Sequence, residues 1–248
     1  MTSKTNPAVL EIGSFGSQPS VNDLDSLTLE SGDIEDLKDC VVGDCQLKLS
    51  ASMIERFRKE IDWDAADYQL AVTNLFKQML IEYVRDYRTR GEAALIEYND
   101  KRDEVSLAAE QRALSGASSY INDLLARAES DLQLAEDSIV WSKIKFGLKP
   151  VIAINHVRIF RRNSDAGPQV LIASNQIYAN HYFNASQALT AFVNFPGVDQ
   201  AAYLVSENRS RADGLEGPFG KLKRGVVEKK AVEGLKSILE HSQASLGG

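Results

Sequence analysis

Alternating polar side chains in the segment 169–183 could line a binding site for a small molecule. In an extended strand, every second residue points to the same face of the sheet. Both faces of this segment mix polar with apolar residues, as expected beside a ligand pocket, which is mostly apolar with a few placed polar groups. A partly exposed sheet with polar ladders is the alternative. The predicted ligand-binding residues are Ser174, Gln176, Tyr178, Asn180 and Tyr182, together with Ser206 and Asn208 in the segment 201–211.

Histidines in two neighbouring predicted strands could provide acid–base chemistry. His156 or His181 could pair with a tyrosine as a general acid and base, provided that both side chains face one cavity. Tyr178 lies three residues before His181, which places the two on opposite faces of a strand. A histidine in the core or on the surface is the alternative. A hydrolase or cyclase using His181 or His156 with a tyrosine is therefore the second functional hypothesis.

Known catalytic and metal-binding motifs are missing from the sequence. It contains no phosphate-binding loop, no nucleophile elbow and no His-Glu-x-x-His zinc motif. No third ligand accompanies the histidines at metal-ligand spacing. We predict no catalytic residue, no metal site and no cofactor.

The only two cysteines, Cys40 and Cys45, flank a turn-forming Gly43-Asp44 pair. A disulfide between them would close a short loop and contribute about 2 kcal/mol by restricting the unfolded chain. Such a bond is typical of an oxidising compartment. Zinc would need further cysteine or histidine ligands nearby, and a haem attachment motif would need a closer pair followed by histidine. Two buried free thiols are the alternative to the disulfide.

Composition and charge restrict the class of protein. The chain has 248 residues, 44% hydrophobic and 25% charged, which is enough for a sizeable core. Its net charge of -7 is uneven: residues 1–140 hold 14 Lys/Arg against 27 Asp/Glu, and residues 141–248 hold 14 against 8. The acidic balance argues against nucleic-acid binding. No apolar run approaches the ~20 residues of a membrane span, and no secretory signal begins the chain as written.

The helices and strands expected from the sequence, which must position these residues, predict an α+β protein. We expect a twisted antiparallel sheet of four to six strands, a long N-terminal helical layer and a C-terminal helix on the sheet. Residues 1–40 read as an extended lead-in with an edge strand near 8–12, and 41–248 as one domain. The expected helices are 52–61, capped by Ser50, a long one from Asp64 to about Tyr98 within a helical block at 51–135, and a basic terminal helix at 218–241. The expected strands within the sheet at 150–211 are 151–162, 169–183, 187–195 and 201–211.

Two resemblances add to this prediction. Long strands followed by one terminal helix, over 150–241, resemble the START-like (SRPBCC) helix-grip domains, which implies a lipid or other apolar ligand held between sheet and helix. The segments 40–49, 173–183 and 207–211 resemble an uncharacterised family of bacterial proteins that usually carry an export signal. That second resemblance implies an exported protein and supports the disulfide.

The sequence therefore favours a non-enzymatic binding or carrier protein for an apolar or amphipathic small molecule such as a lipid. We expect it in the periplasm or otherwise exported if a signal was removed, and in the cytoplasm if the chain is complete as written. The basic helix at 218–241 could contact an anionic membrane surface. A protein-interaction module that uses the long amphipathic helix is a further alternative. The sequence predicts no oligomeric state.

Overall fold

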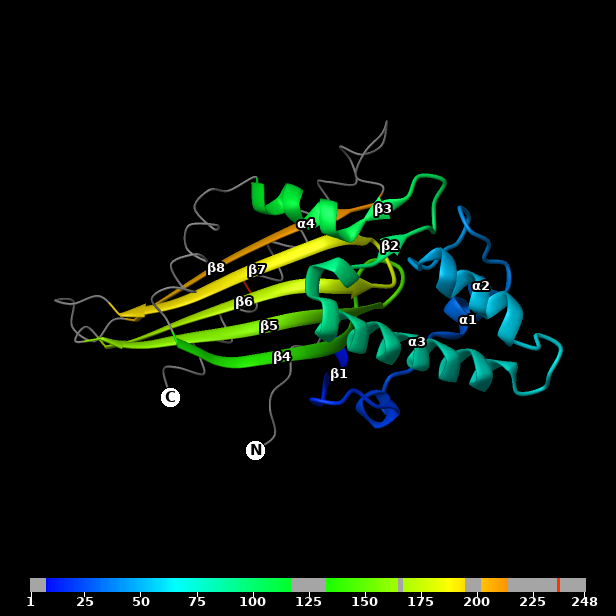
Figure 1. Cartoon of the computed structure of the whole chain (residues 1–248), viewed down its shortest axis with the longest axis horizontal. Coiled ribbons are helices and arrows are strands. Elements are labelled where there is room, and N and C mark those ends of the chain that lie inside the picture. Colours follow the sequence, from blue (N-terminus) through cyan, green and yellow to red (C-terminus); the bar gives the residue numbers. More distant parts are fainter. Residues whose placement is uncertain (1–7, 117–132, 165–166, 195–201, 214–235, 237–248) are drawn as a thin grey trace.

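The computed structural model of the chain describes residues 8–116, 133–164, 167–194 and 202–213, together with Lys236 (Figure 1). It shows the predicted α+β fold. The helices are α1 (Ser31–Lys38), α2 (Ala51–Glu60), α3 (Tyr68–Arg90) and α4 (Leu107–Gly116), with short 3-10 turns η1 (Val21–Leu24) and η2 (Gly91–Ala94). The strands are β1 (Val9–Phe15), β2 (Glu97–Tyr98), β3 (Val105–Ser106), β4 (Gln133–Ile144), β5 (Val151–Ser164), β6 (Gly167–Ala179), β7 (Phe183–Asn194) and β8 (Ala202–Ala212).

Six strands form one antiparallel sheet in the order β1-β4-β5-β6-β7-β8, and β2 pairs with β3 separately. Strands β5 to β8 confirm the four strands predicted within 150–211. The helical block predicted at 51–135 is wrong at its C-terminal end, because β4 begins at Gln133. The first five residues of β4 are exposed and mostly polar, so the apolar alternation that marks a buried strand starts only near Ile139.

The described part of the predicted lead-in, residues 8–40, is more structured than expected. The edge strand is present as β1 and is longer than predicted, pairing with β4 from Val9 to Phe15. The prediction of an extended segment is wrong after β1, because η1 and α1 follow. Leu24 and Leu37 are fully buried in the main core. The 3-10 turn η1 and the helix α1 therefore anchor this segment, because each buries an apolar side chain against the rest of the molecule.

Helix α2 forms where the sequence predicts it, and the Ser50 side chain accepts a hydrogen bond from the Met53 amide at 3.3 Å. Helix α3 is shorter than predicted. It ends at Arg90, and the following Gly91 has a φ of 59°, in a region that favours glycine. Leu95 and Tyr98, expected to continue the helix, lie instead after η2 and in β2. The apolar stripe of α3 is buried inside the molecule: Val72, Leu75, Phe76, Met79, Leu80, Ile81 and Val84.

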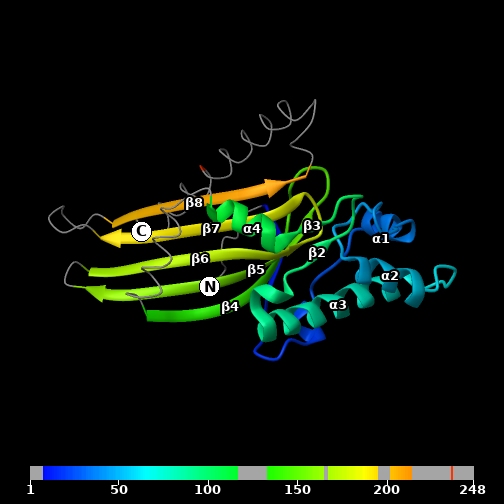
Figure 2. The same ribbon diagram turned by 45° about the horizontal axis from the view of Figure 1, so that its top comes forward.

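The helices lie on one face of the sheet. Figures 1 and 2 show α1, α2 and α3 gathered at one end of the long strands and α4 beside β7 and β8. The main core lies between the helices and the sheet. It contains Trp141, whose Nε1 donates to the Asp23 carbonyl at 2.8 Å. Gly13 allows β1 to approach this ring, because a Cβ there would come within 2.6 Å of Nε1. The helical end and the part of the sheet beneath it therefore share the main core, while two smaller apolar clusters lie elsewhere on the sheet, around Phe160 and around Val151.

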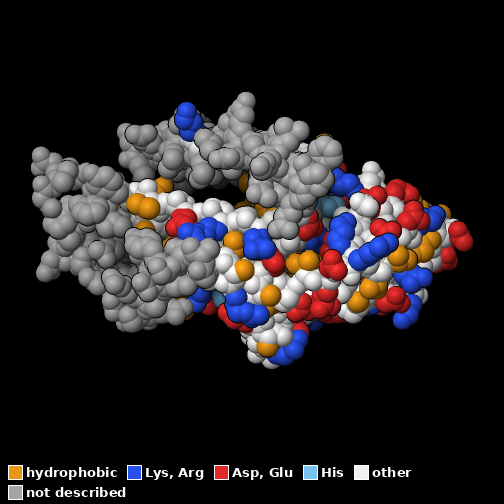
Figure 3. Space-filling view, turned by 90° about the horizontal axis from the view of Figure 1, so that it is seen from above, with side chains coloured by type: hydrophobic (Ala, Val, Ile, Leu, Met, Phe, Trp, Pro, Cys, Tyr) orange, Lys and Arg blue, Asp and Glu red, His pale blue; other side chains and the backbone are white. Residues whose placement is uncertain are grey.

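The surface of the helical end carries charges of both signs, which are interspersed on the face seen in Figure 3. None of the described helices combines the length and the apolar character that a membrane span requires. The helix predicted at 218–241 lies outside the described residues except for Lys236, so its contact with the sheet or with a membrane stays a prediction.

Candidate functional site

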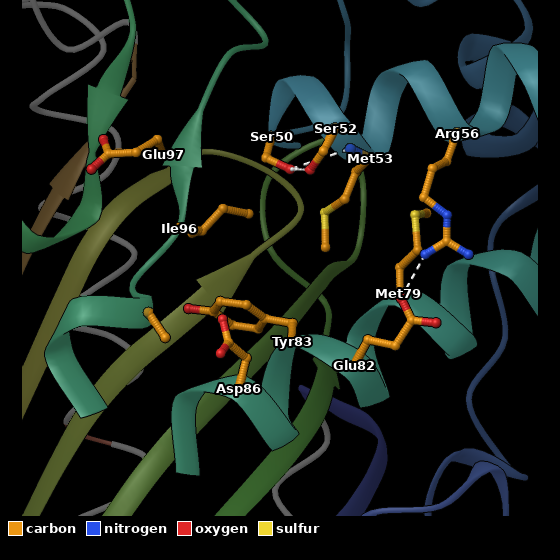
Figure 4. A pocket seen from close by; sticks show the side chains of 11 residues that line it. Ser50, Ser52, Met53, Arg56, Met79, Glu82, Tyr83, Asp86, Ile96 and Glu97 are labelled. Atoms are coloured by element: carbon orange, nitrogen blue, oxygen red, sulfur yellow. Dashed lines mark hydrogen bonds and ion pairs between the residues drawn. The ribbon is translucent and has the colours of Figure 1, made fainter. Parts of the chain in front are cut away.

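A groove of about 480 Å³ opens between α2, α3 and the residues that lead from η2 into β2 (Figure 4). Its lining comes from three places in the chain: Ser50, Ser52, Met53 and Arg56 from the start of α2, Met79, Glu82, Tyr83 and Asp86 from α3, and Ala94, Ile96 and Glu97. The four α3 residues lie at positions i, i+3, i+4 and i+7, so they project from one face of the helix. Helices α2 and α3 and the segment that leads into β2 meet at this point and build the groove.

The groove has an apolar floor and a polar rim. Met53, Met79, Ala94 and Ile96 are buried, whereas Ser52, Glu82 and Glu97 are exposed. Two of the three methionines of the chain lie here. Methionine is flexible and polarisable, so it adapts to ligands of irregular shape. A buried apolar floor under a charged rim is the arrangement that binds an amphipathic molecule.

Arg56 connects the two helices across the groove (Figure 4). Its guanidinium donates to Glu82 at 2.6 Å and to Glu60, one turn away on α2, at 2.7 Å. The hydrogen bond to Glu60 and then the one to Glu82 raise the pKa of Arg56 above its ordinary value. The arginine charge is thus matched by two carboxylates before any ligand enters.

Tyr83 and Asp86 mark one end of the groove (Figure 4). The Tyr83 hydroxyl donates to the Ile177 carbonyl of β6 at 2.5 Å, which fixes the ring, and burial raises its pKa well above the usual value. Asp86 pairs with Arg90 one turn further along α3, and the hydrogen bond from Arg90 lowers the pKa of Asp86. The aromatic ring and the carboxylate lie three residues apart on the same helix face.

None of the seven residues predicted to bind ligand lines this groove, and the structure places them in several parts of the fold. Tyr178 is fully buried in the core, where its ring packs near those of Phe76, Tyr83 and Tyr98. Its hydroxyl donates to the Lys48 carbonyl at 3.2 Å. Tyr178 therefore acts as a core residue in the described structure.

Asn180 and Tyr182 hold the turn between β6 and β7 against the turn between β4 and β5. The Asn180 Oδ1 accepts from the Ile152 amide at 2.8 Å. The Tyr182 hydroxyl accepts from the amides of Leu148 and Lys149, at 3.1 and 2.9 Å. Tyr182 has a φ of 59°, which is unusual for a non-glycine residue, and this turn ends β6 earlier than predicted.

The other predicted residues lie on β6 and β8. Ser174 and Asn208 are both paired with Ala188 of β7, so they share a face of the sheet. That face is opposite to the helices, because the neighbouring Asn175 pairs with His156, which contacts α3. On β8, the Ser206 hydroxyl hydrogen-bonds Thr190. Gln176 is buried, and its Nε2 has no hydrogen-bond partner among the described residues.

His156 forms a hydrogen-bonded chain with Tyr87 and Asp137. Its Nδ1 lies 2.9 Å from the Tyr87 hydroxyl of α3, and its Nε2 lies 2.8 Å from Asp137 Oδ1 of β4. A carboxylate only accepts, so Nε2 carries the proton and the Tyr87 hydroxyl donates to Nδ1. Burial raises the pKa of Tyr87, which keeps the phenol protonated. His156 is thus hydrogen-bonded to a tyrosine that sequence spacing gave no reason to choose, and neither residue lines the groove.

His181 lies in a separate buried charge cluster. Its Nε2 is 3.1 Å from Asp33 Oδ1 of α1, and the same oxygen accepts from Lys149 Nζ at 3.0 Å. Lys149 also pairs with Asp36. Among the described residues, no hydrogen bond joins His181 to a tyrosine hydroxyl. This cluster ties α1 to the turn between β4 and β5 rather than forming an acid–base pair.

The predicted disulfide between Cys40 and Cys45 is present. Its loop is attached to the residues after β2, because the Gly43 amide donates to Asn99 at 2.8 Å and the Cys45 amide to Asp100 at 2.9 Å. A small pocket of about 230 Å³ adjoins it, lined by Asp36, Asp39, Asp44, Gln46 and the two cysteines. Within the described part of the chain, no three His, Cys, Asp or Glu residues are arranged to hold a metal ion.

Searches of protein-family models, curated proteins and solved structures found no match for the chain. The fold and the site therefore define an α+β protein with a disulfide-closed loop and an open groove between helices. The resemblances to helix-grip domains and to exported bacterial proteins stay predictions.

Proposed function

We propose that the protein is a non-enzymatic binding protein for an apolar or amphipathic small molecule, and that it works in an exported state. The groove between α2 and α3 is the site that best supports this function. The observation that carries the proposal is its buried floor of Met53, Met79 and Ile96 beneath a charged rim. Its volume lies within the range of about 300–1,000 Å³ that is usual for ligand pockets.

The Cys40–Cys45 disulfide supports the exported state, because such bonds persist mainly in oxidising compartments. The disulfide loop is also connected to the groove through hydrogen bonds of Asn99. The Asn99 side chain accepts from the Ala51 amide at the start of α2, while the Asn99 carbonyl accepts from Gly43 in the disulfide loop. An oxidised protein therefore keeps this wall of the groove in place.

Filling the mouth of the groove is expected to remove ligand binding. Ser52 is exposed at the rim, so Ser52→Trp adds bulk there without disturbing the core. We expect native mass spectrometry of the oxidised wild-type protein to show a bound mass that organic extraction removes. The added apolar dye Nile red should bind to the extracted protein and bind about tenfold more weakly to Ser52→Trp, a change of about 1.4 kcal/mol.

Arg58→Trp is the matched control, because Arg58 is exposed on another face of α2 and does not line the groove. It should bind Nile red like the wild type. Equal affinity of the wild type and Ser52→Trp, or no binding by the extracted wild-type protein, would contradict the proposal.

Tyr87, His156 and Asp137 favour a second candidate function, that of a hydrolase. Asp137 orients the imidazole and stabilises its positive charge. Tyr87 can then pass its proton to His156 Nδ1 as its oxygen takes a proton from a substrate, so the phenol stays protonated throughout. The Tyr–His–Asp chain is drawn from α3, β5 and β4, and its two hydrogen bonds hold the imidazole between the phenol and the carboxylate.

Turnover of p-nitrophenyl esters would test this second candidate. Both Tyr87→Phe and His156→Gln are expected to lower the rate at least about 100-fold, the usual share of a positioned acid–base group. Thr89→Ala, on an exposed position of the same helix, should keep the wild-type rate. Absence of turnover by the wild type, or equal rates in all variants, would remove the candidate and leave the binding protein.

A further inference from the structure

We propose that the ligand of the groove is a cationic amphiphile, a molecule with an apolar chain and an ammonium head group. This inference rests on the proposed binding function and adds the charge and chemical class of the ligand. It follows from the charges on the rim, from the residues at one end of the groove and from the apolar floor.

The charged residues that line the groove are mainly acidic. Glu82, Asp86 and Glu97 carry carboxylates, and Arg56 is the one cation among the lining residues. Arg56 already donates to Glu82 and to Glu60 outside the groove, so its charge is more than balanced. An anionic head group would therefore have to compete with two carboxylates for Arg56. A cationic head group meets a net negative rim instead.

The end of the groove at Tyr83 and Asp86 suits an ammonium group (Figure 4). Tyr83 is half-buried, lines the groove, and is fixed by its hydrogen bond to the Ile177 carbonyl. An aromatic face beside a carboxylate attracts ammonium ions by cation–π and Coulomb interactions together. Among the described residues, Asp86 pairs with Arg90, an exposed residue one turn away, and exposed pairs of this kind are weak. A ligand cation can replace or join Arg90 at small cost.

The floor provides room for the apolar chain. Met53 and Met79 lie between Ile96 on one side and Arg56 on the other (Figure 4), and all three apolar side chains are buried. A chain that lies along them would place its charged end at Tyr83 and Asp86. The groove is also contained within the acidic part of the chain, where residues 1–140 hold 27 Asp/Glu against 14 Lys/Arg. The wider field of the molecule thus attracts cations to this end.

Three probes with the same dodecyl chain separate charge from apolar contact: dodecyltrimethylammonium, dodecyl maltoside and dodecyl sulfate. Each is titrated below its micelle concentration into the full oxidised chain, with calorimetry for affinity and amide NMR for the site. We expect the cation to bind about tenfold more tightly than the neutral probe and the anion to bind most weakly. Added salt should reduce the preference, because it screens exposed charges.

Variants of the rim test the same point. Asp86→Asn with Glu97→Gln should lower the affinity for dodecyltrimethylammonium about tenfold and leave that for dodecyl maltoside unchanged. Glu55→Gln, on α2 but outside the groove, is the matched control and should change neither.

The outcomes distinguish this inference from the function on which it rests. Equal affinity for the three probes at the groove, or preference for dodecyl sulfate, would overturn the inference and leave a binding groove for apolar molecules. If neither Nile red nor any dodecyl probe shifted the groove resonances, the proposed function itself would fall. Cation-selective binding that survives the rim variants would also overturn the inference, because the charge would then be recognised elsewhere.

Discussion

Replacement of Lys48 by methionine is expected to destabilise the protein by about 3–5 kcal/mol at pH 7, because it leaves the buried Asp100 and the half-buried Asp213 without their cation. Lys48 is only 2% exposed. Its Nζ donates to Asn184 at 2.7 Å and to Asp213 at 2.8 Å, and lies 3.7 Å from Asp100. It also lies 4.6 Å from the centre of the Tyr98 ring. One side chain therefore connects the segment before α2, the segment after β2, and the ends of β7 and β8.

The expected cost depends on pH in a definite direction. Burial raises the pKa of Asp100 above its usual value, although the Lys48 charge opposes this. Without Lys48, the carboxylate of Asp100 is still less favourable, so the folded variant gains a proton more readily than the unfolded chain. The difference in stability between the variant and the wild type should therefore shrink as the pH falls from 7 towards 4.

Urea unfolding followed by circular dichroism gives the free energies. Lys59→Met is the matched control, because Lys59 is 73% exposed and pairs with Glu55 on the surface of α2. It should change stability by less than about 1 kcal/mol. The double variant Lys48→Met with Asp100→Asn should recover part of the loss, which a double-mutant cycle measures. A cost below about 1 kcal/mol for Lys48→Met would show that these charges are not buried in solution.

Much of the fold could be predicted because its signals are local. Ser50 marks the start of α2, and the β-branched runs mark β5 to β8. The strand β4 escaped prediction because its first half is exposed and polar, so its strand character comes from pairing with β1 and β5. Pairing partners far apart in sequence leave no local pattern.

A bulge explains why the residues of the predicted ligand-binding series on β6 do not share one face of the sheet. Strict alternation would place Gln176 and Tyr178 on one face of the sheet. In the structure, Tyr178 pairs with Ile154 and Gln176 with Asn155, which are consecutive residues of β5 and point to opposite faces. Tyr178 therefore turns into the core beside Ile154. The extra residue is set by the two strands together, so the β6 sequence alone does not reveal it.

The groove and the Tyr87–His156 pair could not be predicted for a related reason. The groove needs Met53 of α2 and Met79 of α3 to meet, and no motif connects them. The chain has eight tyrosines, and Tyr87 meets His156 because α3 crosses β5 at this point. The cysteine pair was predictable because its partners lie on either side of one turn.

Replacement of Asp33 by asparagine is expected to cost about 2–3 kcal/mol at pH 7, somewhat less than a fully buried pair because Lys149 is 34% exposed. Asp33 is 1% exposed and accepts from His181 and Lys149. Burial alone would raise the pKa of Asp33, but hydrogen bonds and charges from His181, then from Lys149, lower it overall. The unfolded chain therefore takes up this proton first as the pH falls. The stabilisation is complete above the unfolded pKa of about 3.9 and is lost as the pH falls through the lower folded-state pKa.

The pH profile of unfolding distinguishes this electrostatic role from simple packing. Urea unfolding between pH 7 and pH 2 should show that Asp33→Asn loses less stability on acidification than the wild type, so that the two curves converge at the acid end. Asp103→Asn, at an exposed position, should follow the wild-type curve at every pH. A constant difference between Asp33→Asn and the wild type across the range would mean that the side chain contributes through shape and hydrogen bonding alone. Convergence would show that the charge on Asp33 is what holds α1 to His181 and to the turn between β4 and β5.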